Sequence, residues 1–212
     1  MSNKIISRLT GEQLILSNVY LGDNLAFVNV KLKPYLYGFK NGFHILNIVF
    51  TKIQFNILIN NIINLVALRQ KILIVKDLDY YNLTLSLNSK NVFYYNKKWI
   101  GGVLTNFRVV RKCEKFFDNN KYSNNLSLMR YMPSMVFLFN VNISKWALFE
   151  AYNLEIPLSA IINSNSQFFE FVNYPVIGNN QTFESIYLYV NVLKNAFLKG
   201  KKKERLRILH IL

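Results

Sequence analysis

The groups best suited to chemistry in this sequence are lysines and arginines, and the chemistry they favour is the binding of phosphate. The chain reads YYNKKWIGGVLTNFRVVRK from Tyr94 to Lys112. Its Gly-Gly pair predicts a turn at which the backbone can approach a ligand closely. A helix beginning just after that turn, near Val103, would direct unpaired N–H groups toward an anion. The cations that flank the turn are Lys97, Lys98, Arg108, Arg111 and Lys112. We expect them to contact the phosphates of a nucleic acid.

Trp99 stands inside this cationic segment, and two roles are open to its side chain. An indole at the surface could stack on a base. An indole beneath the turn would instead be an apolar anchor. A second and weaker group of candidate contacts lies nearer the amino terminus and consists of Lys31, Lys33, Lys40 and Asn41.

The carboxyl-terminal segment is also strongly basic. Only Glu204 opposes its cations, which are Lys199, Lys201, Lys202, Lys203, Arg205 and Arg207. Cations suit the carboxyl end of a helix, so a solvated helix end is one interpretation. Their density exceeds what such an end requires, which favours a tail that contacts phosphate.

The charge of the whole chain points the same way. Lys and Arg number 26 against 11 Asp and Glu, which gives a formal net charge of +15 over 212 residues. A hydrophobic fraction of 51% is ample for a packed core and excludes wholesale disorder. A basic, foldable chain predicts a polyanionic partner, either a nucleic acid or an anionic membrane surface.

Motifs for catalysis, cofactors and metals are missing from the sequence. Neither the dinucleotide motif G-x-G-x-x-G nor the phosphate loop G-x-x-x-x-G-K-[ST] occurs. The single cysteine, Cys113, excludes an internal disulfide and a cysteine-cluster zinc site. His44 lies in an apolar stretch and is expected to be a core or hydrogen-bonded histidine, His210 lies in the basic tail, and carboxylates are scarce. We therefore predict no cofactor, no metal site and no enzymatic activity.

The hydrophobic pattern predicts alternating strands and helices. We expect continuously apolar strands over 71–75, 91–95, 135–139 and 157–162, and helices over 52–69, 104–117, 142–153 and 182–200. Such alternation is typical of an α/β domain, with helices on both faces of a parallel sheet. Ligands of such sheets bind beyond the carboxyl ends of the strands. The polar segment 118–125 predicts a loop, and asparagines interrupt the apolar run 53–68, so we expect no membrane span.

Three stretches of the chain resemble a known family. They are YLYGFKNGFHILNI, the segment YYNKKWIGGVLTNF, and the late segments FEAYNLEIPLSAIINSNS and YPVIGNNQTFESI. In order and spacing they resemble the universal small-subunit ribosomal protein 2 family in its bacterial and organellar form. The most specific match sets Lys98–Phe107 against the family pattern R-W-L-G-G-x-L-T-N-F. The resemblance covers most of residues 35–190.

The resemblance implies a flavodoxin-like, Rossmann-type fold without catalytic activity. It implies that the chain binds small-subunit rRNA, contacts neighbouring small-subunit ribosomal proteins and supports subunit assembly, and that it is not a free homo-oligomer. The family carries a long helical hairpin before its third core strand. Only residues 113–132 are available for it here, so we expect a reduced insertion. We expect a core over 31–198, an amino-terminal extension over 1–30 and a basic tail over 199–212.

The chain departs from the family pattern mainly by losing acids. Aspartates of the family are replaced by Asn47, Ser134, Asn140, Asn163, Asn180 and Gln181. Their loss removes repulsion from phosphate and weakens any case for an ion site. The family proline before the glycine is replaced by Ile177, and the arginine before the tryptophan by Lys98.

The excess of Asn, Ile, Lys, Phe and Tyr is typical of an AT-rich genome. No transit peptide is recognisable at the amino end. We therefore expect the chain to be made and to act in an organelle, with the mitochondrial matrix as its compartment. Two alternatives are kept: a nucleotide- or anion-binding enzyme on the same fold, and a peripheral membrane protein that uses its basic tail.

Overall fold

A parallel five-stranded sheet forms the centre of the molecule. The computed structural model describes residues 9–75, 91–95, 97–117 and 126–209. The sheet strands are β4 (Ile72–Val75), β5 (Val92–Tyr95), β6 (Met135–Leu138), β7 (Leu158–Ile162) and β8 (Tyr174–Ile177). Their spatial order is β5-β4-β6-β7-β8, and every neighbouring pair is parallel. This is the strand order of flavodoxin-like folds.

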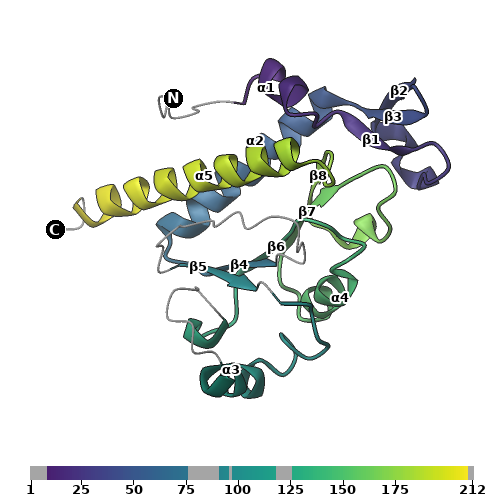
Figure 1. Cartoon of the computed structure of the whole chain (residues 1–212). Coiled ribbons are helices and arrows are strands. Elements are labelled where there is room, and N and C mark those ends of the chain that lie inside the picture. The colour runs from purple at the N-terminus through teal and green to yellow at the C-terminus, as the bar shows by residue number, and fades with distance from the viewer. Residues whose placement is uncertain (1–8, 76–90, 96, 118–125, 210–212) are drawn as a thin grey trace.

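Helices cover both faces of the sheet, as Figure 1 shows. α2 (Ile48–Ala67) and α5 (Phe183–Leu209) pack against each other on one face, next to the short α1 (Gly11–Leu16). α3 (Phe107–Phe117) and α4 (Lys145–Asn153) lie on the other face. Alternate side chains of a strand enter opposite cores, because successive residues of a strand point to opposite faces. In β4, Ile74 belongs to the α2–α5 core and Leu73 to the α3–α4 core.

The predicted α/β class, the four expected strands and the expected helices are confirmed. Every side chain of β4, β5 and β6 is buried, which explains their continuous apolar runs. Several boundaries differ from the prediction. α3 begins at Phe107 instead of Leu104, because residues 101–106 form turns, and α2 begins earlier, at Ile48, where Asn47 caps it.

The last helix was expected to end at residue 200, with Gly200 as its stop, and this prediction is wrong. α5 continues through Gly200 to Leu209. Gly200 is buried, and a Cβ at this position would lie 2.6 Å from Cβ of Val66 on α2. The glycine therefore permits the close approach of two helices. The basic carboxyl-terminal residues up to 209 are helical as a consequence.

The amino-terminal part contains a small antiparallel sheet that the sequence did not predict. Its strands β1 (Leu21–Asn24), β2 (Leu36–Lys40) and β3 (Phe43–Leu46) are arranged in the order β1-β3-β2. The 3-10 turn η1 (Val30–Tyr35) precedes β2, and two further 3-10 turns, η2 (Leu126–Leu128) and η3 (Phe169–Phe171), follow later. Leu14 and Val19 of this part are fully buried in the α2–α5 core.

Candidate nucleic-acid interface

The predicted contact residues lie in three groups at different corners of the molecule. Figure 1 places α3 at the bottom, the carboxyl end of α5 at the left and the β2–β3 hairpin at the upper right. The α3 group holds the cations of the first motif, the α5 group holds the basic carboxyl-terminal residues, and the hairpin group holds the amino-terminal candidates. Any polyanion that contacts all three must therefore follow a path across the surface.

The Gly-Gly turn is filled by a carboxylate of the protein itself. Oε1 of Glu150 accepts hydrogen bonds from the Gly102 N–H at 2.7 Å and from Trp99 Nε1 at 3.1 Å. Oε2 accepts from the N–H groups of Leu104 at 2.8 Å and Thr105 at 3.1 Å. The prediction that these N–H groups face outward toward phosphate is therefore wrong. An anion does occupy the turn, but α4 supplies it.

Trp99 is 6% exposed and packs edge-on against Tyr95, with ring centroids 4.9 Å apart. This position corresponds to the apolar anchor, the second of the two roles that the sequence left open. The neighbouring Lys97 and Lys98 are exposed. Asn96, which belongs to the same predicted strand end, lies outside the described residues, as do Lys76, Asp77 and the predicted loop 118–125.

The side chains of the hairpin group are exposed, and they do not form a single cluster of free cations. Lys31 forms an ion pair with Glu170 of η3, which neutralises part of its charge. Lys33 and Lys40 are exposed without forming an ion pair in the described part of the chain. Asn41 lies at the tip of the β2–β3 hairpin with a φ of 51°, a left-handed conformation that Asn tolerates. Its place in the turn accounts for this residue without a ligand.

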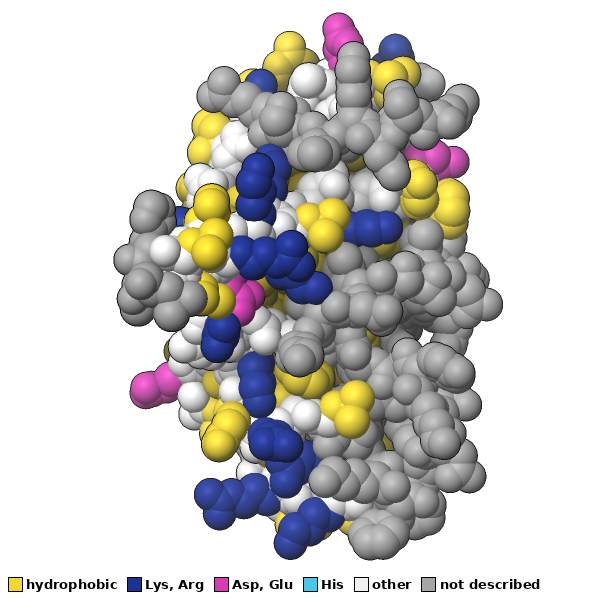
Figure 2. Space-filling view, turned by 90° about the vertical axis from the view of Figure 1, so that its left-hand side faces the viewer, with side chains coloured by type: hydrophobic (Ala, Val, Ile, Leu, Met, Phe, Trp, Pro, Cys, Tyr) yellow, Lys and Arg dark blue, Asp and Glu magenta, His cyan; other side chains and the backbone are white. Residues whose placement is uncertain are grey.

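The α5 group contains six cations and one acid, Glu204. Lys202, Arg205 and Arg207 are exposed, whereas Lys199 and Lys201 are half-buried. Lys203 donates from Nζ to Oδ1 of Asn64 on α2 at 2.8 Å. Figure 2 shows Lys and Arg side chains in a band that runs from the carboxyl end of α5 down toward α3, with few acids beside them.

One acid of this group is already engaged within the protein. Oε1 of Glu204 accepts from Nε of Arg69 at 2.7 Å, and Arg69 follows the carboxyl end of α2. The negative charge of Glu204 therefore neutralises Arg69, which lies outside the basic segment 199–207. The exposed Lys202, Arg205 and Arg207 form no ion pair within the described residues.

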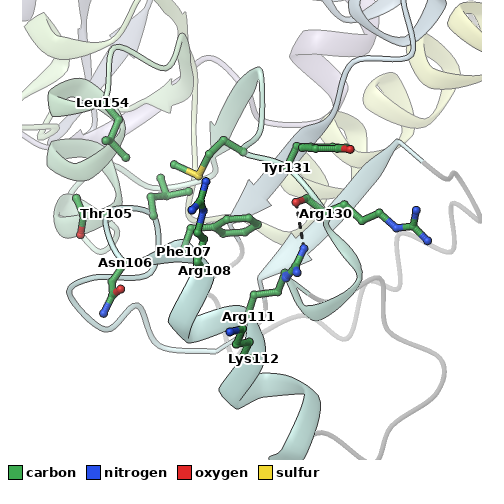
Figure 3. A pocket seen from close by; sticks show the side chains of 11 residues that line it. Thr105, Asn106, Phe107, Arg108, Arg111, Lys112, Arg130, Tyr131 and Leu154 are labelled. Atoms are coloured by element: carbon green, nitrogen blue, oxygen red, sulfur yellow. Dashed lines mark hydrogen bonds between the residues drawn. The ribbon is translucent and has the colours of Figure 1, made fainter.

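A pocket of about 590 Å³ opens beside α3. Four cations, Arg108, Arg111, Lys112 and Arg130, contribute to its wall, and its other lining residues are Leu104, Thr105, Asn106, Phe107, Tyr131, Met132 and Leu154. In Figure 3, Thr105 and Leu154 lie on one side, and Arg130 and Tyr131 on the other. Nη1 of Arg111 donates to the carbonyls of Met129 at 3.2 Å and Arg130 at 3.0 Å, which fixes the chain segment that follows η2.

Sequence reasoning missed Arg130, which lines this pocket, and Lys71, which contacts the lining residue Tyr131. Nζ of Lys71 lies 4.7 Å from the ring centroid of Tyr131. Burial lowers the pKa of Lys71, and the positive charges of Arg130 and Arg111 lower it further. The signal in the sequence was weak, because Lys71 stands alone before β4 and Arg130 alone after η2.

The carboxyl ends of β7 and β8, where a ligand of such a sheet would be expected, are covered by the chain itself. Oγ of Ser164 accepts from the Asp23 N–H at 2.7 Å, and the Asn29 N–H donates to the carbonyl of Ser164 at 2.9 Å. The Asn179 N–H donates to the carbonyl of Val19 at 3.1 Å. Residues 19–29 therefore cover the carboxyl ends of β7 and β8.

Two buried amides pair at that edge. Nδ2 of Asn163 donates to Oδ1 of Asn180 at 3.3 Å, and their side chains are 1% and 3% exposed. Two carboxylates at this separation would repel each other. The amide pair satisfies the same positions without charge.

Neither a metal site nor a clear membrane span is evident among the described residues. No three His, Cys, Asp or Glu side chains gather there in a way that could hold a metal ion. By length and composition alone, α2 is the one described helix that could cross a membrane. It packs along α5 and against β8, and Phe55, Leu58 and Ile62 bury their side chains in the core.

The fold and surface define an α/β protein of flavodoxin-like topology whose cations are concentrated on α3 and α5. The family model described as ribosomal protein S2 matches residues 14–125 and 114–200, and the chain belongs to this family. The small ribosomal subunit protein uS2 of Buchnera aphidicola is 30% identical, over 92% of each chain. The protein uS2m of Marchantia polymorpha is 26% identical over 93% of this chain and 94% of its own. The uS2 of Pseudoalteromonas atlantica is 27% identical over 93% of both. Membership of this family supports a structural role in the small ribosomal subunit.

Proposed function

We propose that the protein binds small-subunit rRNA through its basic surface and holds a fixed place in the subunit by doing so. The observation that carries this proposal is the excess of exposed cations on α3 and α5 over the acids near them. Within the described residues only two ion pairs form, and one of them takes up Glu204, the acid of the α5 group. Unneutralised Lys and Arg side chains release counterions when they meet RNA phosphates, and that release favours binding.

The proposed role is structural and includes no chemical reaction. Support comes from the covered carboxyl ends of β7 and β8 and from relatives that are all named as ribosomal subunit proteins. Neighbouring ribosomal proteins are the other proposed partners, and the protein is not expected to exist as a free homo-oligomer. Its assembly into the subunit supports translation.

For the cellular location we propose the mitochondrial matrix, with the gene in the organelle. The AT-rich codon signature of the composition supports this location, as does the similarity to a relative that bears the name uS2m. Bacterial relatives are equally similar, so the location is tested by experiment. Fractionation of the source cells, followed by detection of the protein in purified mitochondrial small subunits, is the direct measurement.

Sedimentation through a density gradient tests the proposed function. The protein should travel with the small subunit at low salt, and the purified protein should bind small-subunit rRNA with an affinity that falls steeply as salt rises. A protein that stays at the top of the gradient at low salt would contradict the proposal. So would an affinity for the rRNA that does not change with salt.

A further inference from the structure

The pocket beside α3 combines features that one phosphate contact does not require. Its volume of about 590 Å³ is well above what a phosphate group occupies. Ligand pockets for small organic molecules range over roughly 300–1,000 Å³. Four cations line it, and none of them forms an ion pair within the described residues. The space and the charge together suit a group that has both an anionic and a bulkier part.

Tyr131 gives the pocket an aromatic surface. Its side chain is 73% exposed, although Lys71 lies over the ring at 4.7 Å from the centroid. A cation over one face leaves the other face open to solvent. Exposed aromatic rings next to arginines are the surfaces on which proteins stack unpaired bases of RNA.

The geometry of this rim is fixed before any ligand binds. The two hydrogen bonds from Arg111 to the carbonyls of Met129 and Arg130 hold the segment that carries Tyr131. Lys71, which lies over the ring, directly precedes β4, a fully buried strand of the sheet. A ring held by both the helix and the sheet loses little freedom on binding, which favours affinity.

We propose that this pocket receives one unpaired nucleotide of the bound RNA, with its base stacked on Tyr131 and its phosphate bound by cations of the pocket wall. The inference rests on the proposed function and adds to it the kind of RNA feature that is recognised. A paired base inside a duplex cannot reach the ring, since its faces are covered by the stack. A bulged or looped nucleotide can reach the ring. The pocket is therefore expected to bind RNA with unpaired nucleotides more tightly than a uniform duplex.

Binding to two hairpin RNAs tests this inference with the full-length protein. The RNAs are identical except for one bulged adenosine, and fluorescence anisotropy gives each dissociation constant at the same salt concentration. Wild-type protein should prefer the bulged hairpin. Tyr131→Ala should weaken binding to the bulged hairpin by about 5- to 100-fold, as expected for the loss of one base–aromatic stack, and should change binding to the plain hairpin little. Tyr131→Phe should keep the preference.

Tyr37 provides a matched control, because it is 82% exposed and lies on β2, far from α3. Tyr37→Ala should bind both RNAs as the wild type does. If Tyr131→Ala and Tyr37→Ala behave alike, or if the wild type does not discriminate between the hairpins, the inference is overturned while the proposed function stands. If the wild type binds neither RNA, both the proposed function and the inference are overturned.

A competition arm separates RNA from free nucleotide as the source of the bound group. Adenosine monophosphate in large excess should leave the complex with the bulged hairpin intact, because a single nucleotide lacks the flanking phosphates that the other cations contact. Displacement by adenosine monophosphate at concentrations close to those of the RNA would overturn the assignment to RNA.

Discussion

Trp99 and Glu150 are joined by a hydrogen bond of 3.1 Å from the indole Nε1 to Oε1, across 51 residues of sequence. The same carboxylate accepts three backbone N–H groups of the Gly-Gly turn. The bond therefore ties the most specific motif of the chain to α4 on the face of the sheet that carries α3. The motif shapes this turn and holds the residues from which α3 and its pocket begin.

Glu150→Gln should lower the free energy of unfolding by about 2–4 kcal/mol, because a buried amide leaves part of the four donors unpaired. Denaturant unfolding, followed by tryptophan fluorescence, measures the change. Glu155→Gln is the control: its side chain is exposed, and its effect should stay below about 0.5 kcal/mol. A Glu150→Gln protein as stable as the control would mean that the carboxylate does not organise the turn.

Gly200→Ala distinguishes a helix stop from a helix crossing. In a solvated helix this change would stabilise by about 0.5–1 kcal/mol. Here the new Cβ would meet Val66 Cβ at 2.6 Å and the backbone carbonyl of Ile63 at 3.1 Å, so we expect destabilisation by about 1–3 kcal/mol. Thermal unfolding gives the sign directly. An increase in melting temperature would refute the close contact of α2 and α5, and Lys194→Ala on the exposed side of α5 serves as the reference.

The central strands were predictable because burial on both faces leaves a continuous apolar run, as in Ile72–Val75 and Met135–Leu138. Strand β8 could not be predicted, because it is short and contains Pro175. The proline is tolerated since β8 is an edge strand. Gly200 was misread because a glycine at a helix crossing and a glycine at a helix end look identical in one sequence.

The candidate site was predictable only in part. The cations of α3 and α5 follow from local sequence, because they are neighbours along the chain. No local signal places Glu150 in the Gly-Gly turn, since the two are joined only by the packing of α4 on the sheet. The approach of Lys71 to Tyr131 and Arg130 likewise depends on the order of the strands, because β4 and β6 are neighbours in the sheet.

Gly178 and Tyr189 should show strong coupling in a double-mutant cycle. A Cβ at Gly178 would overlap Oη of Tyr189, which is fully buried. Gly178→Ala should therefore destabilise the fold by about 2–3 kcal/mol. Tyr189→Phe removes the overlapping oxygen and should restore part of that loss, although Val19 Cγ1 would still lie 3.3 Å from the new Cβ. Additive effects, measured by denaturant unfolding, would contradict the predicted contact.

The same tyrosine should make the protein sensitive to alkali. Burial raises the pKa of Tyr189 above its ordinary value near 10, and burial raises the pKa of Tyr94 in the same direction. The unfolded chain therefore loses these protons first, and their contribution to stability is present below pH 10 and is lost as the pH rises above it. Tyr189→Phe should flatten this decline in the free energy of unfolding between pH 9 and pH 11, about one unit either side of that value. Identical slopes for variant and wild type would be the contrary result.

The position of the cations, and not the net charge alone, should control RNA affinity. Lys202→Gln with Arg205→Gln removes two exposed cations of the α5 group. Lys145→Gln with Lys194→Gln removes the same charge from exposed sites outside the three groups. If the α5 group contacts phosphate, the first pair should reduce the slope of log affinity against log salt by about 1–2, because each phosphate contact on a duplex contributes about 0.9. The second pair should leave the slope near the wild-type value and weaken binding only slightly, since distant charges are screened beyond about 8–10 Å. Titrations of small-subunit rRNA at several salt concentrations give both slopes. Equal slopes for the two double variants would show that the net charge attracts the RNA and that the α5 group does not dock on it.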